Sequence, residues 1–226
     1  MTRDTLNRQM SHIQDEILIL GSMVEQATLA AVEALKKRDK VAAKSIFLND
    51  QVINEKRFAI ENAVIILMAT QQPMARDLRQ MAAMLEVNTE LERMGDYAKG
   101  IAKVALLMGE GDVFIPTQEI DKMTEIAVSM LHRALSAFIS ENSSQALIIP
   151  KEDDQVDELF NVAYRKIVDE MIANPASIDQ TNLVMWVIHN IERMADRVTN
   201  ICERTVFIAT GELFEVDGMD EDDIDI

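Results

Sequence analysis

Apolar residues recur every three or four positions through the first segment of the chain, which is the spacing of one face of an α-helix. The steps alternate between four and three, a heptad pattern in which each apolar side chain packs against a partner helix. The pattern predicts a long amphipathic helix that buries one stripe in a helical bundle. Its apolar positions are Leu6, Met10, Ile13, Ile17, Leu20, Val24, Ala27, Ala31 and Ala34.

Capping and helix-breaking residues divide the rest of the chain into five further predicted helices. Asp39 is suited to cap the second, and Pro73 is tolerated in the first turn of the third. Gly109 and Pro116 mark a linker, and Pro150 should kink the fifth helix near its start. The predicted helices after the first span residues 40–71, 73–108, 117–140, 143–173 and 179–210.

The last helix of each half repeats a motif at an offset of 100 residues. Residues 90–112 read ELERMGDYAKGIAKVALLMGEGD, and residues 190–212 read NIERMADRVTNICERTVFIATGE. A weaker match at an offset of 103 residues aligns residues 50–54 with residues 153–157. Two matches in the same order along the chain indicate an internal duplication.

The composition fits this helical plan, because the chain has only 7 Gly, 4 Pro and 4% aromatic residues. Sheets and barrels need frequent turns and are rich in aromatic residues. We therefore predict an all-α protein of two tandem three-helix bundles related by an internal repeat. The predicted bundles are residues 1–111 and 117–212, and we expect residues 213–226 to form a disordered acidic tail.

The net charge of −17 argues against a nucleic acid as partner, because the phosphate backbone would be repelled over most of the surface. Eight acidic residues lie in residues 212–226, which form either a solvated end or a handle for a basic partner. A single cysteine, Cys202, excludes an intrachain disulfide and favours a reducing compartment. The longest uncharged stretch, residues 62–75, is too short to span a membrane. We expect a soluble, cytoplasmic protein.

Acidic pairs four residues apart recur at the same place in both halves. Glu92 and Asp96 share one face of a predicted helix, with Cβ atoms about 5–6 Å apart, and Glu192 and Asp196 repeat that arrangement. Like charges at this spacing are unfavourable unless a proton, an arginine or a metal cation neutralises them. An arginine follows each glutamate in the sequence and is one candidate counter-ion.

The predicted middle helices supply a second polar pair each, Asp50 with Asn54 and Asp153 with Asp157. If the middle and last helices of a half pack antiparallel, four oxygen-bearing side chains converge. Mg²⁺, Mn²⁺ and iron bind such oxygen-rich sites. The alternative is a purely structural bundle, in which each acidic pair faces solvent.

The sequence gives little indication of an enzyme active site. His189 lies three residues before Glu192, which resembles a reversed Glu-x-x-His of di-iron bundles, but Thr89 stands at the equivalent position of the first half. Phosphate loops, nucleophile elbows and zinc-type cysteine patterns are missing from the sequence. Cys202 and the methionines are expected in the core. We therefore expect no enzyme, with a carboxylate-bridged metalloenzyme as the alternative.

Three segments resemble the PhoU family of phosphate-specific transport accessory proteins: LERMGDYA at residues 91–98, IERMADRVTNICERTVFIATGE at residues 191–212 and QPMARDLR at residues 72–79. The resemblance extends over nearly the whole chain. It implies two three-helix bundles, with Fe, Mn, Mg or Zn ions held at the acidic motifs. It also implies a non-catalytic adaptor that restrains phosphate uptake and the phosphate-starvation response.

The partners that the resemblance implies are the ATPase of a phosphate transporter and a phosphate-sensing histidine kinase, and we expect a homodimer. Asn200 and Glu203 extend the family's second motif, whereas Gly100 and Lys103 stand at these places in the first half, so we expect weaker metal binding there. A regulator of a different phosphate carrier is the remaining alternative. The family's paired motifs fall on Asp50, Asn54, Glu92, Asp96, Asp153, Asp157, Glu192 and Asp196.

Overall fold

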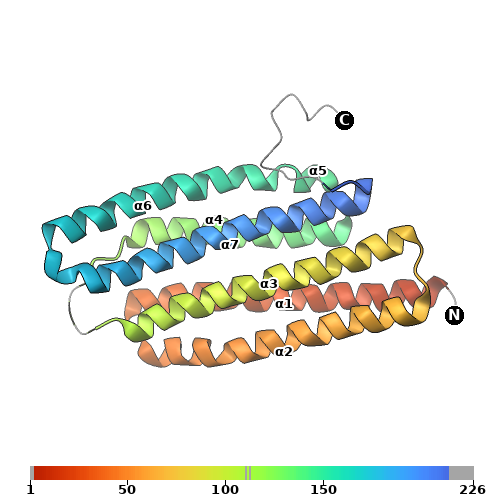
Figure 1. The fold of residues 1–226 in the computed structure, drawn as a ribbon, viewed down its shortest axis with the longest axis horizontal. Coiled ribbons are helices and arrows are strands. Elements are labelled where there is room, and N and C mark those ends of the chain that lie inside the picture. Colours follow the sequence, from red (N-terminus) through yellow and green to blue (C-terminus); the bar gives the residue numbers. More distant parts are fainter. Residues whose placement is uncertain (1–2, 110, 112, 214–226) are drawn as a thin grey trace.

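The computed structural model describes residues 3–109, 111 and 113–213, which are helical almost throughout and contain no strand. The long helices run roughly parallel to the longest axis of the molecule (Figure 1). Residues 214–226, most of the predicted acidic tail, lie outside the described residues. The prediction of an all-α tandem repeat is confirmed. The elements are α1 (Arg3–Lys37), α2 (Lys40–Gln71), α3 (Ala75–Leu107), α4 (Thr117–Ser140), α5 (Ser143–Ala146), η1 (Ile149–Glu152), α6 (Asp153–Ala173), η2 (Pro175–Ser177) and α7 (Ile178–Thr210).

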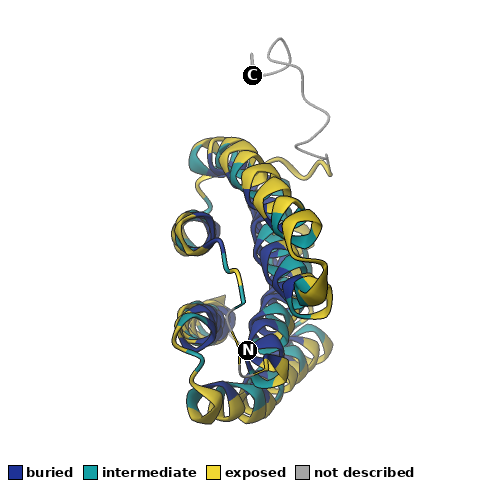
Figure 2. Ribbon diagram, turned by 90° about the vertical axis from the view of Figure 1, so that its left-hand side faces the viewer, coloured by how far each residue is buried: buried dark blue, intermediate teal, exposed yellow. Residues whose placement is uncertain are grey.

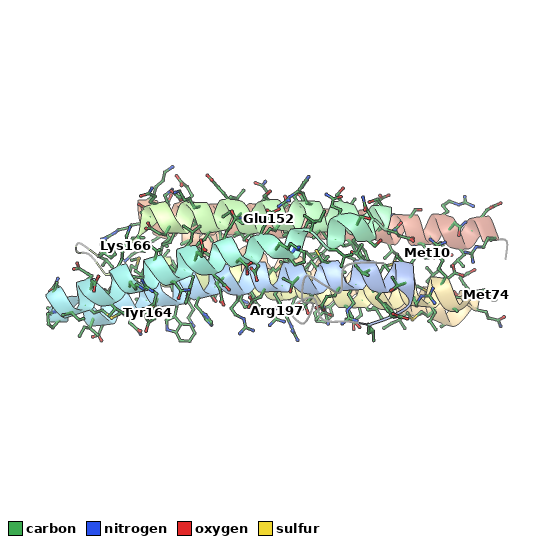
Figure 3. The ribbon with its side chains drawn as sticks, turned by 90° about the horizontal axis from the view of Figure 1, so that it is seen from above. Met10, Met74, Glu152, Tyr164, Lys166 and Arg197 are labelled. Carbon is green, nitrogen blue, oxygen red and sulfur yellow. The ribbon has the colours of Figure 1, made fainter. Side chains whose placement is uncertain are left out.

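The predicted caps are right for α2 and misplaced by two residues for α3. Asp39 Oδ1 accepts hydrogen bonds from the second and third amides that follow it, at 3.0 and 2.9 Å. Pro73 lies before α3 instead of in its first turn. The start of α3 is stabilised by Asp77, which accepts from the Met74 amide at 3.1 Å and from Arg3 at 2.5 and 2.8 Å. Met10 and Met74, labelled in Figure 3, lie at this same end of the molecule.

Pro150 breaks the predicted fifth helix, where we expected a kink. α5 ends at Ala146, Pro150 lies in the 3₁₀ turn η1, and α6 begins directly after it. A proline ring clashes with the carbonyl four residues earlier and provides no N–H for that hydrogen bond, so the helix cannot continue through this position. Arg133 of α4 holds the turn by two hydrogen bonds to Glu152 at 2.6 and 2.5 Å.

Burial follows the internal repeat at most of the apolar positions. At the offset of 103, three buried apolar positions of α2 match three of α6. At the offset of 100, α3 and α7 share the same buried positions over most of their length. The repeat is therefore structural as well as sequential. The buried pairs of the middle helices are Ile53 with Val156, Ile60 with Ala163, and Val64 with Ile167.

The two halves share one core. α3 packs against α7, α1 packs against α4, and the buried apolar side chains of both halves form a single cluster. Figure 2 shows the buried residues on the inward faces of the helices and the exposed residues on the outside. The predicted core positions are confirmed for Cys202 and for methionines of α3 such as Met84 and Met94, all of which are buried.

By length and composition alone, α1 is long and apolar enough to cross a membrane. One face of α1 points into the shared core, where Ile17, Leu20 and Val24 are fully buried, although Ile19 and Leu29 are exposed. The core helix of a soluble protein passes the same test of length and composition.

Gly21 allows the close approach of α1 to α4. A Cβ atom at this position would overlap Cδ1 of Leu135. We expect Gly21→Val to lower the free energy of unfolding by roughly 1–3 kcal/mol, because the added side chain overpacks the contact between the halves. Urea unfolding followed by circular dichroism measures the change. Ser22→Val, at the exposed neighbouring position, is the control, and equal stabilities of the two variants would contradict the account.

Candidate metal centre

Two acidic clusters lie at equivalent places in the two halves. The first acidic cluster is formed by α2 and α3, and the second by α6 and α7. In the first cluster, burial raises the pKa of Glu92, and the negative charges of Asp96 and Asp50 raise it further. Asp50 of α2 and Glu92 of α3 are therefore close enough to interact. We define the first cluster as Asp50, Asn54, Glu92 and Asp96, and the second as Asp153, Asp157, Glu192 and Asp196.

The first cluster contains an ammonium group. Lys99 Nζ lies 2.6 Å from Asp50 Oδ2 and 3.7 Å from Asp96 Oδ1. The amide nitrogen of Asn54 donates to the same Asp50 oxygen at 2.9 Å. The hydrogen bond to Asp50 is the main reason why the pKa of Lys99 is raised, so the side chain is charged at neutral pH. The buried carboxylate of Asp50 is thus neutralised from within the chain.

Sequence reasoning missed Lys99 and named Lys103 as the nearby positive charge. Lys103 is exposed, one helical turn beyond Lys99. The spacing of three residues between Asp96 and Lys99 was an available signal, because such residues share a helix face. The contact between Lys99 and Asp50 depends instead on how α2 is aligned against α3, which spacing within one helix does not reveal.

A second cation lies near the first cluster. The positive charge of Arg57 on α2 lowers the pKa of Glu92, opposing the effect of burial. Arg57 also pairs with Glu61 at 2.8 Å. Arg93, one of the predicted counter-ions, lies 3.7 Å from Glu90. Positive charge at the first cluster therefore comes from residues of two helices.

The second cluster holds excess negative charge. Burial raises the pKa of Glu192 to about 7, and the negative charges of Asp196 and Asp157 add to the shift. Glu192 Oε2 is buried and makes no hydrogen bond to the described residues, although His189 Nδ1 lies 3.3 Å away. Arg193 Nε lies 3.5 Å from Asp196 Oδ2, as expected of a counter-ion. Its positive charge lowers the pKa of Glu192, but by less than burial, Asp196 or Asp157 raises it.

Two residues that supply positive charge to the first cluster have neutral counterparts in the second. At the repeat offsets, Lys99 corresponds to Thr199 and Arg57 corresponds to Phe160. The hydroxyl of Thr199 donates to the backbone carbonyl of Asp196 at 2.6 Å. The duplicated motifs have therefore diverged in charge, and the divergence leaves the second cluster more negative.

Asn200 faces α3. Its amide nitrogen donates to Glu90 Oε2 at 3.2 Å, and Arg197 Nη1 lies 3.4 Å from the same oxygen. Arg197 Nε also donates to the hydroxyl of Tyr97 at 3.3 Å, from the middle of α7 where Figure 3 labels the side chain. Asn200 and Glu203 line a polar pocket of about 370 Å³ between the two helices. The structure thus assigns Asn200 a contact with α3 that the motif alone did not suggest.

Gly100 has a packing role at the equivalent point of the first half. A Cβ atom there would lie 2.8 Å from Nδ2 of Asn190 on α7, too close for an ordinary contact. Glycine therefore lets α7 approach α3. Gly100, which stands where the second half has Asn200, therefore leaves room for the side chain of Asn190.

The two clusters differ in how well they suit a metal ion. In the part of the chain that the structure describes, no three His, Cys, Asp or Glu side chains are arranged to hold a metal ion as they stand. The first cluster does not fit a divalent cation, because Lys99 and Asn54 already donate to Asp50 Oδ2. The second cluster fits in charge, because Glu192 has a buried oxygen without a hydrogen bond and two carboxylates nearby.

Comparison with known proteins gives one consistent result. A model of the PhoU domain matches residues 17–105 and again residues 120–205. The chain is 35% identical over 214 residues to the phosphate-specific transport system accessory protein PhoU homolog of Clostridium acetobutylicum, covering 94% of this chain and 97% of that protein. It is 30% identical over 215 residues to the phosphate-specific transport system accessory protein PhoU of Escherichia coli, covering 95% and 89%.

The structure is similar to solved structures of the same family. The crystal structure of the phosphate transport system regulatory protein PhoU from Streptococcus pneumoniae superimposes with a TM-score of 0.86 at 32% identity. The match covers 92% of this chain and 99% of the other. Both repeats and nearly the full length are therefore similar to proteins of one family.

The raised pKa of Glu192 predicts a pH-dependent stability in chelator-treated protein. The folded state binds the proton more tightly than the unfolded state, whose glutamate has a pKa of 4.5. The stability contributed by Glu192 is therefore complete below pH 4.5 and is lost as pH rises through about 7. We expect Glu192→Gln to stabilise the protein by about 1–2 kcal/mol at high pH, after allowance for solvent screening, and to leave it unchanged at low pH.

Urea unfolding at a series of pH values measures this difference, with Glu158→Gln at an exposed position of α6 as the control. A constant difference between Glu192→Gln and the parent across the pH range would refute the assignment of a raised pKa to Glu192.

Proposed function

The chain belongs to the PhoU family, and we propose on that premise that it is a negative regulator of phosphate uptake and of phosphate-starvation signalling. The observation that carries the proposal is the double match of the PhoU domain, at residues 17–105 and 120–205. Relatives at 30–35% identity are named as accessory proteins of phosphate-specific transport. We propose that the protein works in the cytoplasm, where it acts on the transport components.

The proposed role is non-catalytic. Relatives are named as accessory or regulatory proteins rather than by a reaction. Burial raises the pKa of the Cys202 thiol to about 12, so this cysteine is not a nucleophile. The protein would act by binding other proteins in alternative combinations.

The proposed partners are the ATPase of the transporter and a phosphate-sensing histidine kinase. Support for a docking role comes from α2, whose outer face carries large exposed apolar side chains, a feature typical of protein interaction surfaces. The same kind of surface would serve a second copy in the proposed homodimer. These side chains are Val41, Leu48, Val52, Phe58, Ile65 and Ile66.

We propose that the second acidic cluster holds a divalent or iron-type metal ion through Asp153, Asp157, Glu192 and Asp196. Oxygen ligands and excess negative charge favour such a cation. A bound ion would neutralise the carboxylates and cross-link α6 to α7. The contacts that support the proposal are the buried Glu192 oxygen without a hydrogen bond and the charges of Asp157 and Asp196 around it.

Deletion of the gene tests the regulatory role. We expect phosphate-starvation genes to be expressed in phosphate-rich medium in the deletion strain, because the restraint on signalling is lost. A transcriptional reporter measures the change, and a plasmid-borne copy of the wild-type gene should restore repression. Unchanged reporter expression in the deletion strain would count against the proposed function.

Metal content tests the proposed metal site separately. We expect protein purified without chelator to retain metal through mild chelation when the first cluster is altered by Glu92→Ala and Asp96→Ala. The matched variant Glu192→Ala with Asp196→Ala should lose it, because the second cluster is the more negative of the two. Elemental analysis of both proteins gives the answer. Greater retention by the second variant would reverse the assignment, and no metal in the parent would rule it out.

A further inference from the structure

The first acidic cluster differs from the second in having a cation built into it. Asp50 is only 5% exposed, and a buried carboxylate needs a charged partner or a metal ion. Lys99 Nζ provides that partner at 2.6 Å and lies 3.7 Å from Asp96. We infer that the ammonium of Lys99 is the resident counter-ion of the first cluster and excludes divalent metal ions from it. The inference rests on the proposed function in one respect, the premise that these duplicated motifs are able to bind metal.

The geometry at Asp50 leaves little opportunity for a metal ion. Oδ2 accepts hydrogen bonds from both Lys99 and the amide nitrogen of Asn54, at 2.6 and 2.9 Å. A divalent ion would bind that oxygen at about 2.0–2.6 Å and would meet a positive charge beside it. The ion would also meet an N–H group of Asn54, where the second cluster offers the carboxylate of Asp157.

Further contacts hold the ammonium in place. Nζ of Lys99 lies 5.6 Å from the ring centroid of Phe47, within the range of a cation–π interaction. Phe47 and Asp50 belong to α2 and Lys99 belongs to α3, so the contacts tie the middle helix of the half to its last helix. The proposed metal ion would tie α6 to α7 in the same way.

The second half lacks each part of this arrangement. At the repeat offsets, Lys99 corresponds to Thr199, Asn54 to Asp157 and Phe47 to Pro150. Thr199 is 7% exposed, and its hydroxyl donates to the carbonyl of its own helix. The two repeats therefore differ at equivalent carboxylates: the first carries an internal ammonium, whereas the proposed partner of the second is an external cation.

The test uses full-length protein in which Glu192→Ala and Asp196→Ala remove the second cluster, so that only the first can bind. Mn²⁺ is the probe, with binding measured by equilibrium dialysis and elemental analysis, and with the melting temperature measured at each concentration. Three further variants are made in this background. They are Lys99→Gln, which removes the charge, Lys99→Arg, which keeps it, and Lys103→Gln at the exposed lysine one turn away.

We expect stoichiometric Mn²⁺ binding and an Mn²⁺-dependent rise in melting temperature only in Lys99→Gln. Without Mn²⁺, that variant should melt at a lower temperature than Lys103→Gln, because its carboxylates repel one another. Mn²⁺ binding by the background protein or by Lys99→Arg overturns the inference. So does failure of Lys99→Gln to bind Mn²⁺, whether or not its melting temperature falls. If Lys99→Gln folds only when Mn²⁺ is present, the inference is supported.

The outcome is independent of the second cluster. Absence of metal from that cluster would defeat the proposed metal site, and unchanged phosphate signalling in the deletion strain would count against the regulatory role. Neither result would alter any result of the Lys99 series. Failure of the Lys99 series would leave the regulatory role and the second cluster as they stand.

Discussion

The packing of α3 against α7 determines how the rest of the molecule is arranged. The two helices run antiparallel, since Glu90 on α3 meets Asn200 on α7 while Gly100 on α3 meets Asn190 on α7. Their apolar faces are buried at matching positions of the repeat and join the two halves in one core. Because this contact fixes the rotation of each helix about its axis, it also fixes which residues remain to face α2 and α6. The acidic pairs fall on those remaining faces.

The duplication explains why the clusters recur, and the contact between the halves explains part of their divergence. Gly100 leaves room for the side chain of Asn190, and it provides no oxygen donor where the second half has Asn200. Lys99 and Arg57 bring positive charge to the first cluster, and the residues at the equivalent positions of the second half are the neutral Thr199 and Phe160. The first half has an internal ammonium, and in the second half burial, with the negative charges of Asp196 and Asp157, raises the pKa of Glu192 to about 7.

Most of the fold could be predicted from the sequence, because apolar periodicity and capping residues act locally. The cap at Asp39 and the end of α4 at Ser140 are examples. Pro150 was predicted to kink a helix and instead ends it, since η1 is also held by Arg133 of another helix. For the acidic clusters, the sequence predicted the carboxylates but not the ammonium beside them. Spacing gave the acidic pairs, but the approach of Lys99 to Asp50 depends on packing between helices.

On this proposal the first of the two equivalent clusters is closed by the Lys99 ammonium, and the second binds a metal ion. Anomalous X-ray scattering from crystals grown in Mn²⁺ tests it most directly, because the signal locates the ion without any substitution. We expect an anomalous peak between α6 and α7, beside Glu192 and Asp196, and none beside Asp50. A peak at Asp50 and Glu92 with none at Glu192 would contradict it.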